Sequence, residues 1–204
     1  MKIAHLKVLL AVVEAGGVSA ASRMLGRAQS GVSSTVTELE RCLKHPLFER
    51  TPSGCFPNDT CEQLLPRIRS LIGLLDDWPY WSRVQPLDGR PSFCSLPDPG
   101  IREHRLEIFL SVMQAGSMKR AALGMGISQP AVSASISVME KCTSTRSLFK
   151  RASGKLAPEA YSFELAAIAQ QVLNELKVIE NDALNRQQSN LDDNPFSEVR
   201  VCTW

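Results

Sequence analysis

The chain has 204 residues, a formal net charge of +2 at pH 7 and a hydrophobic fraction of 44%. This length allows one large domain or two small ones, and the hydrophobic fraction can fill ordinary cores. The small net charge excludes a strongly basic protein, so binding to nucleic acid must depend on where the cations lie. The apolar run from Val8 to Val13 is short and amphipathic, which is typical of neither a signal peptide nor a membrane span.

The six cysteines and three histidines show no spacing that is typical of a metal site or a catalytic group. No two cysteines form a CxxC pair, and the histidines are scattered along the chain. We therefore expect no metal, no cofactor and no enzymatic activity. Cysteines without a disulfide framework indicate a reducing compartment, so we expect a cytoplasmic protein with no membrane partner.

The chain contains an internal repeat with a period of one hundred residues. Segment 47–50 (Leu-Phe-Glu-Arg) aligns with segment 148–151 (Leu-Phe-Lys-Arg) after a one-residue slip. Chance does not produce so many matches at apolar and turn positions, so the chain holds two copies of one domain. The identities include the pairs Leu6/Leu106, Leu10/Leu110, Gly16/Gly116, Ala21/Ala121, Gly26/Gly126, Gln29/Gln129, Val32/Val132, Ser33/Ser133 and Glu40/Glu140.

Each copy shows the periodicity of three helices, a small hairpin and a long helix. The glycine between the second and third helices supplies the tight turn of a helix-turn-helix. The predicted fold is therefore mainly α, with two tandem winged helix-turn-helix domains, each followed by a long dimerisation-type helix. The expected segments are the first domain at 1–57, a long helix at 58–78, a Pro-rich linker at 79–101, the second domain at 102–157, a second long helix at 158–182 and a flexible tail at 183–204.

The long helices carry apolar stripes of about five turns, which is more than a small domain can cover. We expect each to pack against another long helix rather than back onto its own domain. Pairing within one chain and pairing between two chains both remain open. The stripes are Leu64, Leu65, Ile68, Leu71, Ile72 and Leu75, and Phe163, Leu165, Ile168, Val172, Leu173, Leu176 and Ile179.

The third helix of copy two begins at the motif Ser-Gln-Pro-Ala-Val-Ser, residues 128–133. Ser128 is expected to cap this helix, and Pro130 suits its first turn because the missing N–H costs nothing there. One face is apolar, and the other carries short polar side chains. Such a helix suits insertion into a DNA major groove, although a plain surface helix is the alternative.

This motif, the following Leu-Phe-x-Arg and the order of elements resemble the DNA-binding domain of LysR-type transcriptional regulators, over residues 2–78 and again over 102–182. In copy one, residues 28–33 (Ala-Gln-Ser-Gly-Val-Ser) are a degraded version of the motif. The resemblance implies that the long helix pairs antiparallel with a second one, in a homodimer or with a partner regulator. The family's two-lobed inducer-binding domain has no counterpart in these residues, which implies control independent of a small ligand.

The resemblance also implies which residues bind DNA. The family often has Arg or Gln directly after Pro-Ala-Val-Ser, whereas this chain has Ser34-Thr35 and Ala134-Ser135, so affinity must come mostly from phosphate contacts. A solvated surface charge is the alternative role for each cation. The candidates are Arg23, Arg27, Gln29, Ser30, Ser33, Ser34, Thr37, Arg50 and Ser53 in copy one, and Lys119, Arg120, Ser128, Gln129, Pro130, Ser133, Ala134, Ser137, Lys150, Arg151 and Lys155 in copy two.

The sequence thus predicts a ligand-independent, sequence-specific regulator that binds double-stranded promoter DNA in the cytoplasm, in association with the nucleoid. The alternative is a protein-interaction module that pairs with or sequesters other regulators, or contacts RNA polymerase. The missing arginines and the small net charge favour the alternative. The basic residues Arg50 and Arg151 and the intact motif of copy two favour DNA binding.

Overall fold

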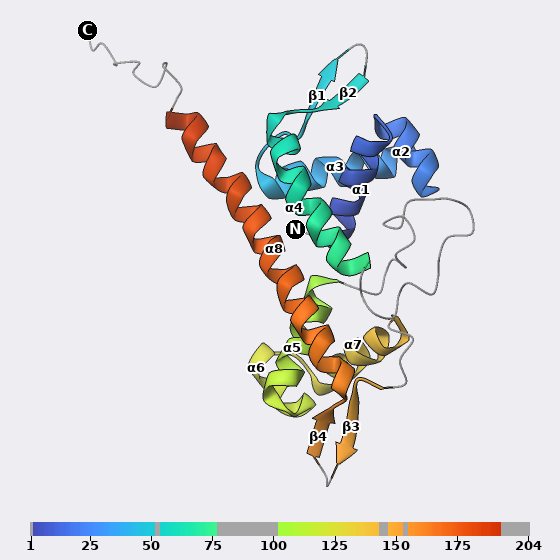
Figure 1. The fold of residues 1–204 in the computed structure, drawn as a ribbon, viewed down its shortest axis with the longest axis vertical. Helices are drawn as coiled ribbons and strands as arrows, with labels where there is room; N and C mark the ends of the chain where they lie inside the picture. Colours follow the sequence, from blue (N-terminus) through green and yellow to red (C-terminus); the bar gives the residue numbers. More distant parts are fainter. Residues whose placement is uncertain (1, 52–53, 77–101, 143–146, 153–154, 193–204) are drawn as a thin grey trace.

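The computed structural model describes residues 2–51, 54–76, 102–142, 147–152 and 155–192, and the Pro-rich linker expected at 79–101 lies outside these ranges (Figure 1). The fold is mainly α, as predicted. Copy one contains α1 (Ile3–Glu14), α2 (Val18–Leu25), α3 (Gln29–Leu43), β1 (Phe48–Thr51), β2 (Gly54–Pro57) and α4 (Asp59–Asp76). Copy two contains α5 (Glu103–Ala115), α6 (Met118–Met125), α7 (Gln129–Cys142), β3 (Phe149–Ala152), β4 (Lys155–Pro158) and α8 (Ala160–Asp192).

Local signals in the sequence set the ends of the short helices. Gly26 and Gly126 end α2 and α6 in the left-handed conformation, with φ of 63° and 65°. The backbone N–H of Ala131 donates to Ser128 Oγ at 3.3 Å, so the predicted cap of α7 is confirmed. In copy one, Ala28 stands at the equivalent position and provides no side-chain cap.

A glutamate near the end of the third helix ties that helix to the hairpin in both copies. Glu40 accepts a hydrogen bond from the backbone N–H of Leu47 at 2.9 Å, and Glu140 accepts one from Leu148 at 2.8 Å. The glutamates are 100 residues apart and the leucines are 101 apart. The one-residue slip of the repeat therefore falls in the connection that follows the third helix.

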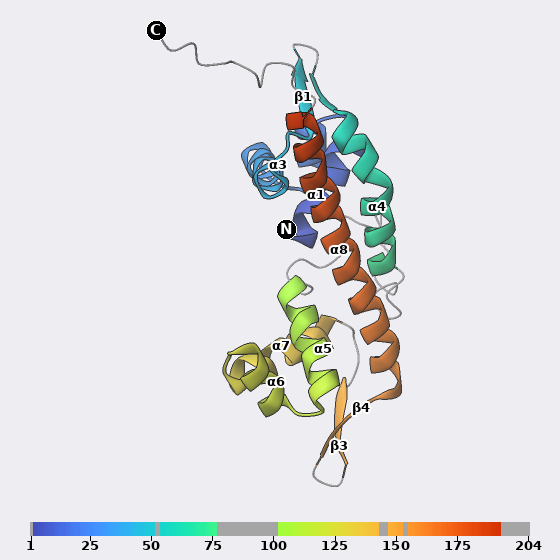
Figure 2. The same ribbon diagram turned by 90° about the vertical axis from the view of Figure 1, so that its left-hand side faces the viewer.

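The two long helices pack against each other in antiparallel directions within the chain (Figures 1 and 2). The predicted stripe of α4 is buried along its whole length, and α8 buries Leu165, Val172, Leu173, Leu176 and Ile179 against it and the neighbouring helices. Helix-on-helix packing is therefore confirmed, and in this structure the partner helix belongs to the same chain.

The start of the α8 stripe was predicted wrongly. Phe163 is 59% exposed, and Ser162 is buried instead, with its Oγ donating to the carbonyl oxygen of Leu148 at 2.7 Å. Helical spacing from the buried Leu165 reaches back to 162, not 163, which explains the difference. In α4 the equivalent position is Cys61, and burial raises the pKa of its thiol to about 12, so the thiol stays neutral.

Helix α8 also runs to Asp192, although the sequence suggested a helix end at 182 and a flexible tail from 183. The segment after 182 is polar but contains neither glycine nor proline before Pro195. Polar composition alone does not end a helix, because Gln, Arg and Asn cost little in a helix interior.

The first helices of the two copies meet where they begin. The backbone N–H of Ile3 at the start of α1 donates to the carboxylate of Glu103 at the start of α5. These residues occupy the same position in the two copies, so the contact lies near a local two-fold axis that relates them. Glu103 caps α1, whose own N-cap residue, Lys2, provides no side-chain cap.

No single helix in the described ranges is both long and apolar enough to span a membrane; α1 and α2 meet that criterion only when joined, and a bend of 119° separates them.

The glutamate that joins helix to hairpin gives a test of the fold. We expect Glu140→Ala to lower the free energy of unfolding by about 1–3 kcal/mol, because the partly buried N–H of Leu148 loses its acceptor. Glu140→Gln should cost less, because its amide oxygen can still accept that hydrogen bond. Urea unfolding followed by circular dichroism measures both, and equal losses would contradict a role for the hydrogen bond.

Candidate nucleic-acid interface

Helices α3 and α7, the third helices of the two copies, are named here the recognition helices. Each buries one face in its own copy: Val32, Val36 and Leu39 in α3, and Val132, Ile136 and Met139 in α7. The opposite face carries the polar candidates predicted from the sequence. Gln29, Ser30, Ser34, Thr37, Ser128, Gln129, Pro130, Ser133, Ala134 and Ser137 are exposed, and Ser33 is half-buried.

Both recognition helices lie on the same side of the α4–α8 pair, one in each half of the molecule (Figure 2). The hairpins β1–β2 and β3–β4 lie at opposite ends of the molecule (Figure 1). Each hairpin is a regular antiparallel pair, with Phe48 opposite Pro57 in one and Phe149 opposite Pro158 in the other. The α4–α8 pair thus holds the two recognition helices so that both lie on the same side of it.

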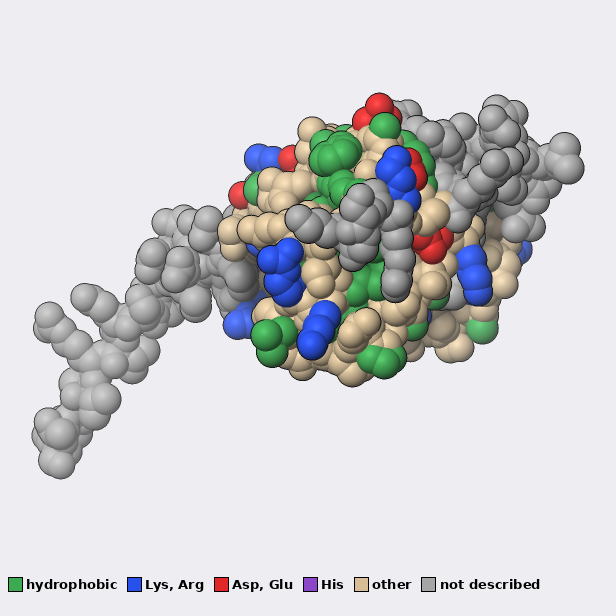
Figure 3. Space-filling view, turned by 90° about the horizontal axis from the view of Figure 1, so that it is seen from below, with side chains coloured by type: hydrophobic (Ala, Val, Ile, Leu, Met, Phe, Trp, Pro, Cys, Tyr) green, Lys and Arg blue, Asp and Glu red, His purple; other side chains and the backbone are tan. Residues whose placement is uncertain are grey.

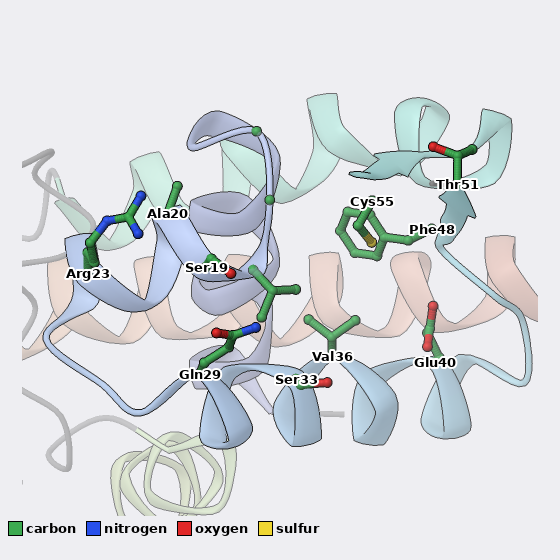
Figure 4. Close-up of a pocket in the computed structure, with 13 residues that line it drawn as sticks. Ser19, Ala20, Arg23, Gln29, Ser33, Val36, Glu40, Phe48, Thr51 and Cys55 are labelled. Atoms are coloured by element: carbon green, nitrogen blue, oxygen red, sulfur yellow. The ribbon is translucent and has the colours of Figure 1, made fainter. Parts of the chain in front are cut away.

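A hollow of about 550 Å³ flanks the recognition helix of copy one (Figure 4). Three candidates predicted from the sequence, Arg23, Gln29 and Ser33, line this hollow together. The other walls come from the turn at Gly16 and Gly17, the start of α2 and the hairpin. They consist of Val18, Ser19 and Ala20, of Val36 and Glu40 in α3, and of Phe48, Thr51 and Cys55 in the strands.

Sequence reasoning missed the wall made by the start of α2. Gly17 is the N-cap residue of α2 and has no side chain with which to cap this helix. The paired glycines at 16 and 17 were the available signal, because they allow an abrupt turn next to the recognition helix. Copy two has Met118 and Arg120 where copy one has Val18 and Ala20, so the two copies offer differently shaped surfaces beside the same helix.

The candidate cations occupy different positions in the two copies. Arg23 and Arg27 are exposed near the end of α2, whereas Lys119 and Arg120 are exposed at the start of α6. Lys150 in β3 pairs with Glu159 at 3.3 Å. Backbone positions place Arg50 in β1, Arg151 in β3 and Lys155 in β4, while the side chains of these three residues and the whole of Ser53 lie outside the described part of the structure.

At the copy-two end of the molecule, the described Lys and Arg side chains lie apart from one another. Figure 3 shows Lys and Arg side chains spread around this end, with hydrophobic side chains between them. Leu123, in α6, is 84% exposed at the position where copy one has Arg23. Among the side chains that the structure describes, the cations on this face do not form a single basic patch.

One further cation on a recognition helix, Arg41, forms an ion pair on the same helix. Arg41 donates from Nη2 and Nε to the carboxylate of Glu38 at 2.7 and 3.0 Å. This hydrogen bonding holds the pKa of Glu38 below its usual value and raises the pKa of Arg41. Thr35 likewise donates its hydroxyl to the carbonyl oxygen of Gly31 at 2.8 Å. The described residues contain no group of three or more side chains that could hold a metal ion.

Comparison with known proteins identifies the family. The chain matches the family described as bacterial regulatory helix-turn-helix protein, lysR family, over residues 3–62 and again over 104–160. The chain belongs to this LysR family. Because the two matched segments coincide with the two copies, the resemblance inferred from the motif is confirmed.

The similar proteins are named as regulators. HTH-type transcriptional regulator GalR of Pseudomonas putida is 34% identical over 178 residues, which cover 87% of this chain and 43% of the relative. Small neutral protease regulatory protein of Streptomyces coelicolor is 38% identical over 72 residues, covering 35% of this chain and 22% of the relative. HTH-type transcriptional regulator AdmX of Serratia plymuthica is 44% identical over 71 residues, which cover 35% of this chain and 23% of the relative. The chain thus spans less than half the length of these relatives.

A glycine inside the recognition helix of copy one provides a test of this surface. Gly31 is exposed, and an added Cβ would meet no atom within 4 Å. We expect Gly31→Ala to raise the free energy of unfolding by about 1 kcal/mol, because alanine has the higher helix propensity. The reverse change at the equivalent position, Ala131→Gly, should lower it by a similar amount. Urea unfolding measures both, and a loss of stability in Gly31→Ala would show that the backbone there is not helical.

Proposed function

We propose that this LysR-family chain is a sequence-specific transcriptional regulator whose two winged helix-turn-helix domains bind one DNA duplex together. The domains are residues 1–57 and 102–157. The observation that carries the proposal is the presentation of both recognition helices on one side of the α4–α8 pair (Figure 2). Gln29 and Gln129 are exposed on these helices. Gln side chains in a major groove can read adenine with two hydrogen bonds.

The long alignment with the Pseudomonas regulator supports a tandem arrangement. Any stretch of 178 residues within these 204 includes residues 27–178, and therefore most of both copies. A protein named as a transcriptional regulator thus resembles this chain across both units in one continuous region. This alignment supports treating the two copies as one functional regulator. We propose that this regulator acts on promoter DNA, in association with the nucleoid.

The two half-sites of the DNA target should differ. Thr37 and Ser137 occupy equivalent positions on the two recognition helices. The exposed cations of the second helix lie near its end in copy one (Arg23 and Arg27) and at its start in copy two (Lys119 and Arg120). Phosphate contacts set the orientation of a protein on DNA, and base contacts set the sequence. A single chain with two unlike units therefore matches an asymmetric operator.

We also propose that this binding needs no small ligand. The α4–α8 pair already holds both recognition helices outward, so no rearrangement by an effector is required to present them. Salt dependence should be strong, because hydrogen bonds from Gln, Ser and Thr are weaker than bidentate contacts from Arg to guanine, so most of the affinity must come from phosphate contacts.

The test is selection of bound duplexes from a random library by the full chain, followed by titration over a range of salt concentrations. We expect an asymmetric site. Replacing Lys119 and Arg120 with Ala should make the negative slope of log K, the association constant, against log salt concentration shallower by about 2. Each phosphate contact contributes about 1 to the size of this slope. Gln129→Ala should weaken binding to the selected site by about 1–3 kcal/mol and relax one base position.

The matched control replaces Arg69 and Lys177 with Ala, since these exposed cations lie on α4 and α8 rather than on the recognition helices or hairpins. This control should leave the slope unchanged. No salt-dependent binding to any duplex would refute the proposal. That result would favour the second candidate, a protein-interaction module, for which the exposed Leu123 in α6 is the specific observation.

A further inference from the structure

Arg67 of α4 forms ion pairs with α8. Arg67 in α4 approaches Asp182 of α8 through Nε at 3.0 Å and Glu175 of α8 through Nη1 at 3.7 Å. The side chains are partly exposed (47% for Arg67, 31% for Glu175 and 34% for Asp182). Ion pairs exposed to this degree add little stability. They can still discriminate between partners, because specificity depends only on a difference between two pairings.

The internal repeat tells which residues would replace this cluster in other pairings. From the hairpin onwards the two copies correspond with an offset of 101: the backbone N–H of Asn58 donates to the carbonyl of Leu47, and that of Glu159 donates to Leu148. Residues of the buried stripes follow the same offset, as in Leu64 and Leu165.

With this offset, Arg67 of α4 corresponds to Ile168 of α8, and Glu175 of α8 corresponds to Leu74 of α4. The position equivalent to Asp182 falls beyond Asp76, where α4 ends. The helix pair is therefore asymmetric in charge. One side has a cation facing two carboxylates, and the side related by the local two-fold axis has the half-buried apolar residues Ile168 and Leu74.

Pairing of identical helices would remove every one of these ion pairs. In an antiparallel α4–α4 pair from two chains, each Arg67 would face Leu74 in place of Glu175, and the position that corresponds to Asp182 is Trp81. In an α8–α8 pair, Glu175 and Asp182 of each chain would face Ile168, which leaves two groups of like charge without a cation. Of these three pairings, only α4 with α8 brings Arg67 next to Glu175 and Asp182.

We propose that Arg67, Glu175 and Asp182 form a pairing code that makes α4 and α8 of this chain partners and disfavours dimers built from two identical long helices. The interaction surface is the α4–α8 seam, and the partner it fits is the long helix of the other copy. A consequence, which rests on the proposed function, is that one chain occupies both half-sites in a fixed order.

Sedimentation velocity of the full chain without DNA, over a wide concentration range, tests the pairing code. The wild-type chain should be monomeric. Ile168→Arg places a cation at the position of α8 that corresponds to Arg67. An α8–α8 pair then gains the ion pairs twice, while the α4–α8 seam gains a charge beside Leu74. We expect this variant to raise the dimer association constant at least tenfold. The matched control Gln171→Arg adds the same charge at an exposed position of α8 and should leave the chain monomeric.

A second set of variants keeps the proposal testable if Ile168→Arg folds poorly. Arg67→Glu should loosen the seam, seen as a drop in melting temperature, and combining it with Glu175→Arg and Asp182→Arg should recover most of that loss. Arg69→Glu, the same change at an exposed position of α4, is the control. Failure of the triple variant to recover while Arg69→Glu is silent would overturn the pairing code.

A wild-type dimer that neither Arg67→Glu nor Ile168→Arg alters would overturn it as well, because pairing of identical α4 helices does not involve the carboxylates of α8. Two chains that exchange their α8 helices would keep the ion pairs, so Arg67→Glu must weaken such a dimer. These readouts contain no DNA, so their failure is distinguishable from a failure of the proposed function.

Discussion

The antiparallel packing of α4 against α8 is the constraint on which the arrangement of the molecule depends. Ile68 and Leu71 on α4 and Val172 and Ile179 on α8 are fully buried along these helices. A fully buried aliphatic side chain contributes about 1.5–3 kcal/mol, whereas an exposed ion pair contributes about 0–1 kcal/mol. The apolar stripes therefore hold the helices together, and the charges around Arg67 can only influence which helices pair. Because each long helix continues directly from its hairpin, fixing the pair also fixes where the two recognition helices lie.

Much of the fold could be predicted because its signals are local or periodic. The repeat, the glycine turns and the Ser128 cap each depend on residues close together in sequence, and the apolar stripes follow helical spacing. The failures arose where local signals are weak. Polar residues after 182 do not specify a helix end. Phe163 was assigned to the buried stripe because it is apolar, although helical spacing from Leu165 points to residue 162. The partners of Arg67 could not be predicted at all, since they depend on which helix packs against α4.

The recognition surface was predictable for the same reason, and the space beside it was not. The spacing of Val132, Ile136 and Met139 determines which face of α7 points outward, so the exposed polar positions follow from the sequence alone. The hollow of copy one needs three segments brought together by the fold: the start of α2, the recognition helix and the hairpin. The pairing of Arg41 with Glu38 shows that a cation on the correct helix can already be occupied. The sequence gives the number of cations, but it does not show which of them can contact DNA.

The differences between the copies are understandable if tethering compensates for a weaker unit. Copy one lacks the side-chain cap at Ala28 and carries Gly31 inside its recognition helix, whereas copy two keeps Ser128 and Ala131. On separate chains, a weakened unit would bind DNA poorly by itself. Held by the α4–α8 pair beside a unit that is already bound, it meets the same duplex at an effective concentration on the order of millimolar. In the proposed regulator, therefore, copy one adds affinity and a second half-site even with weak contacts of its own. The helix pair already holds copy one near the DNA, so its binding loses less translational and rotational entropy than the binding of a separate chain.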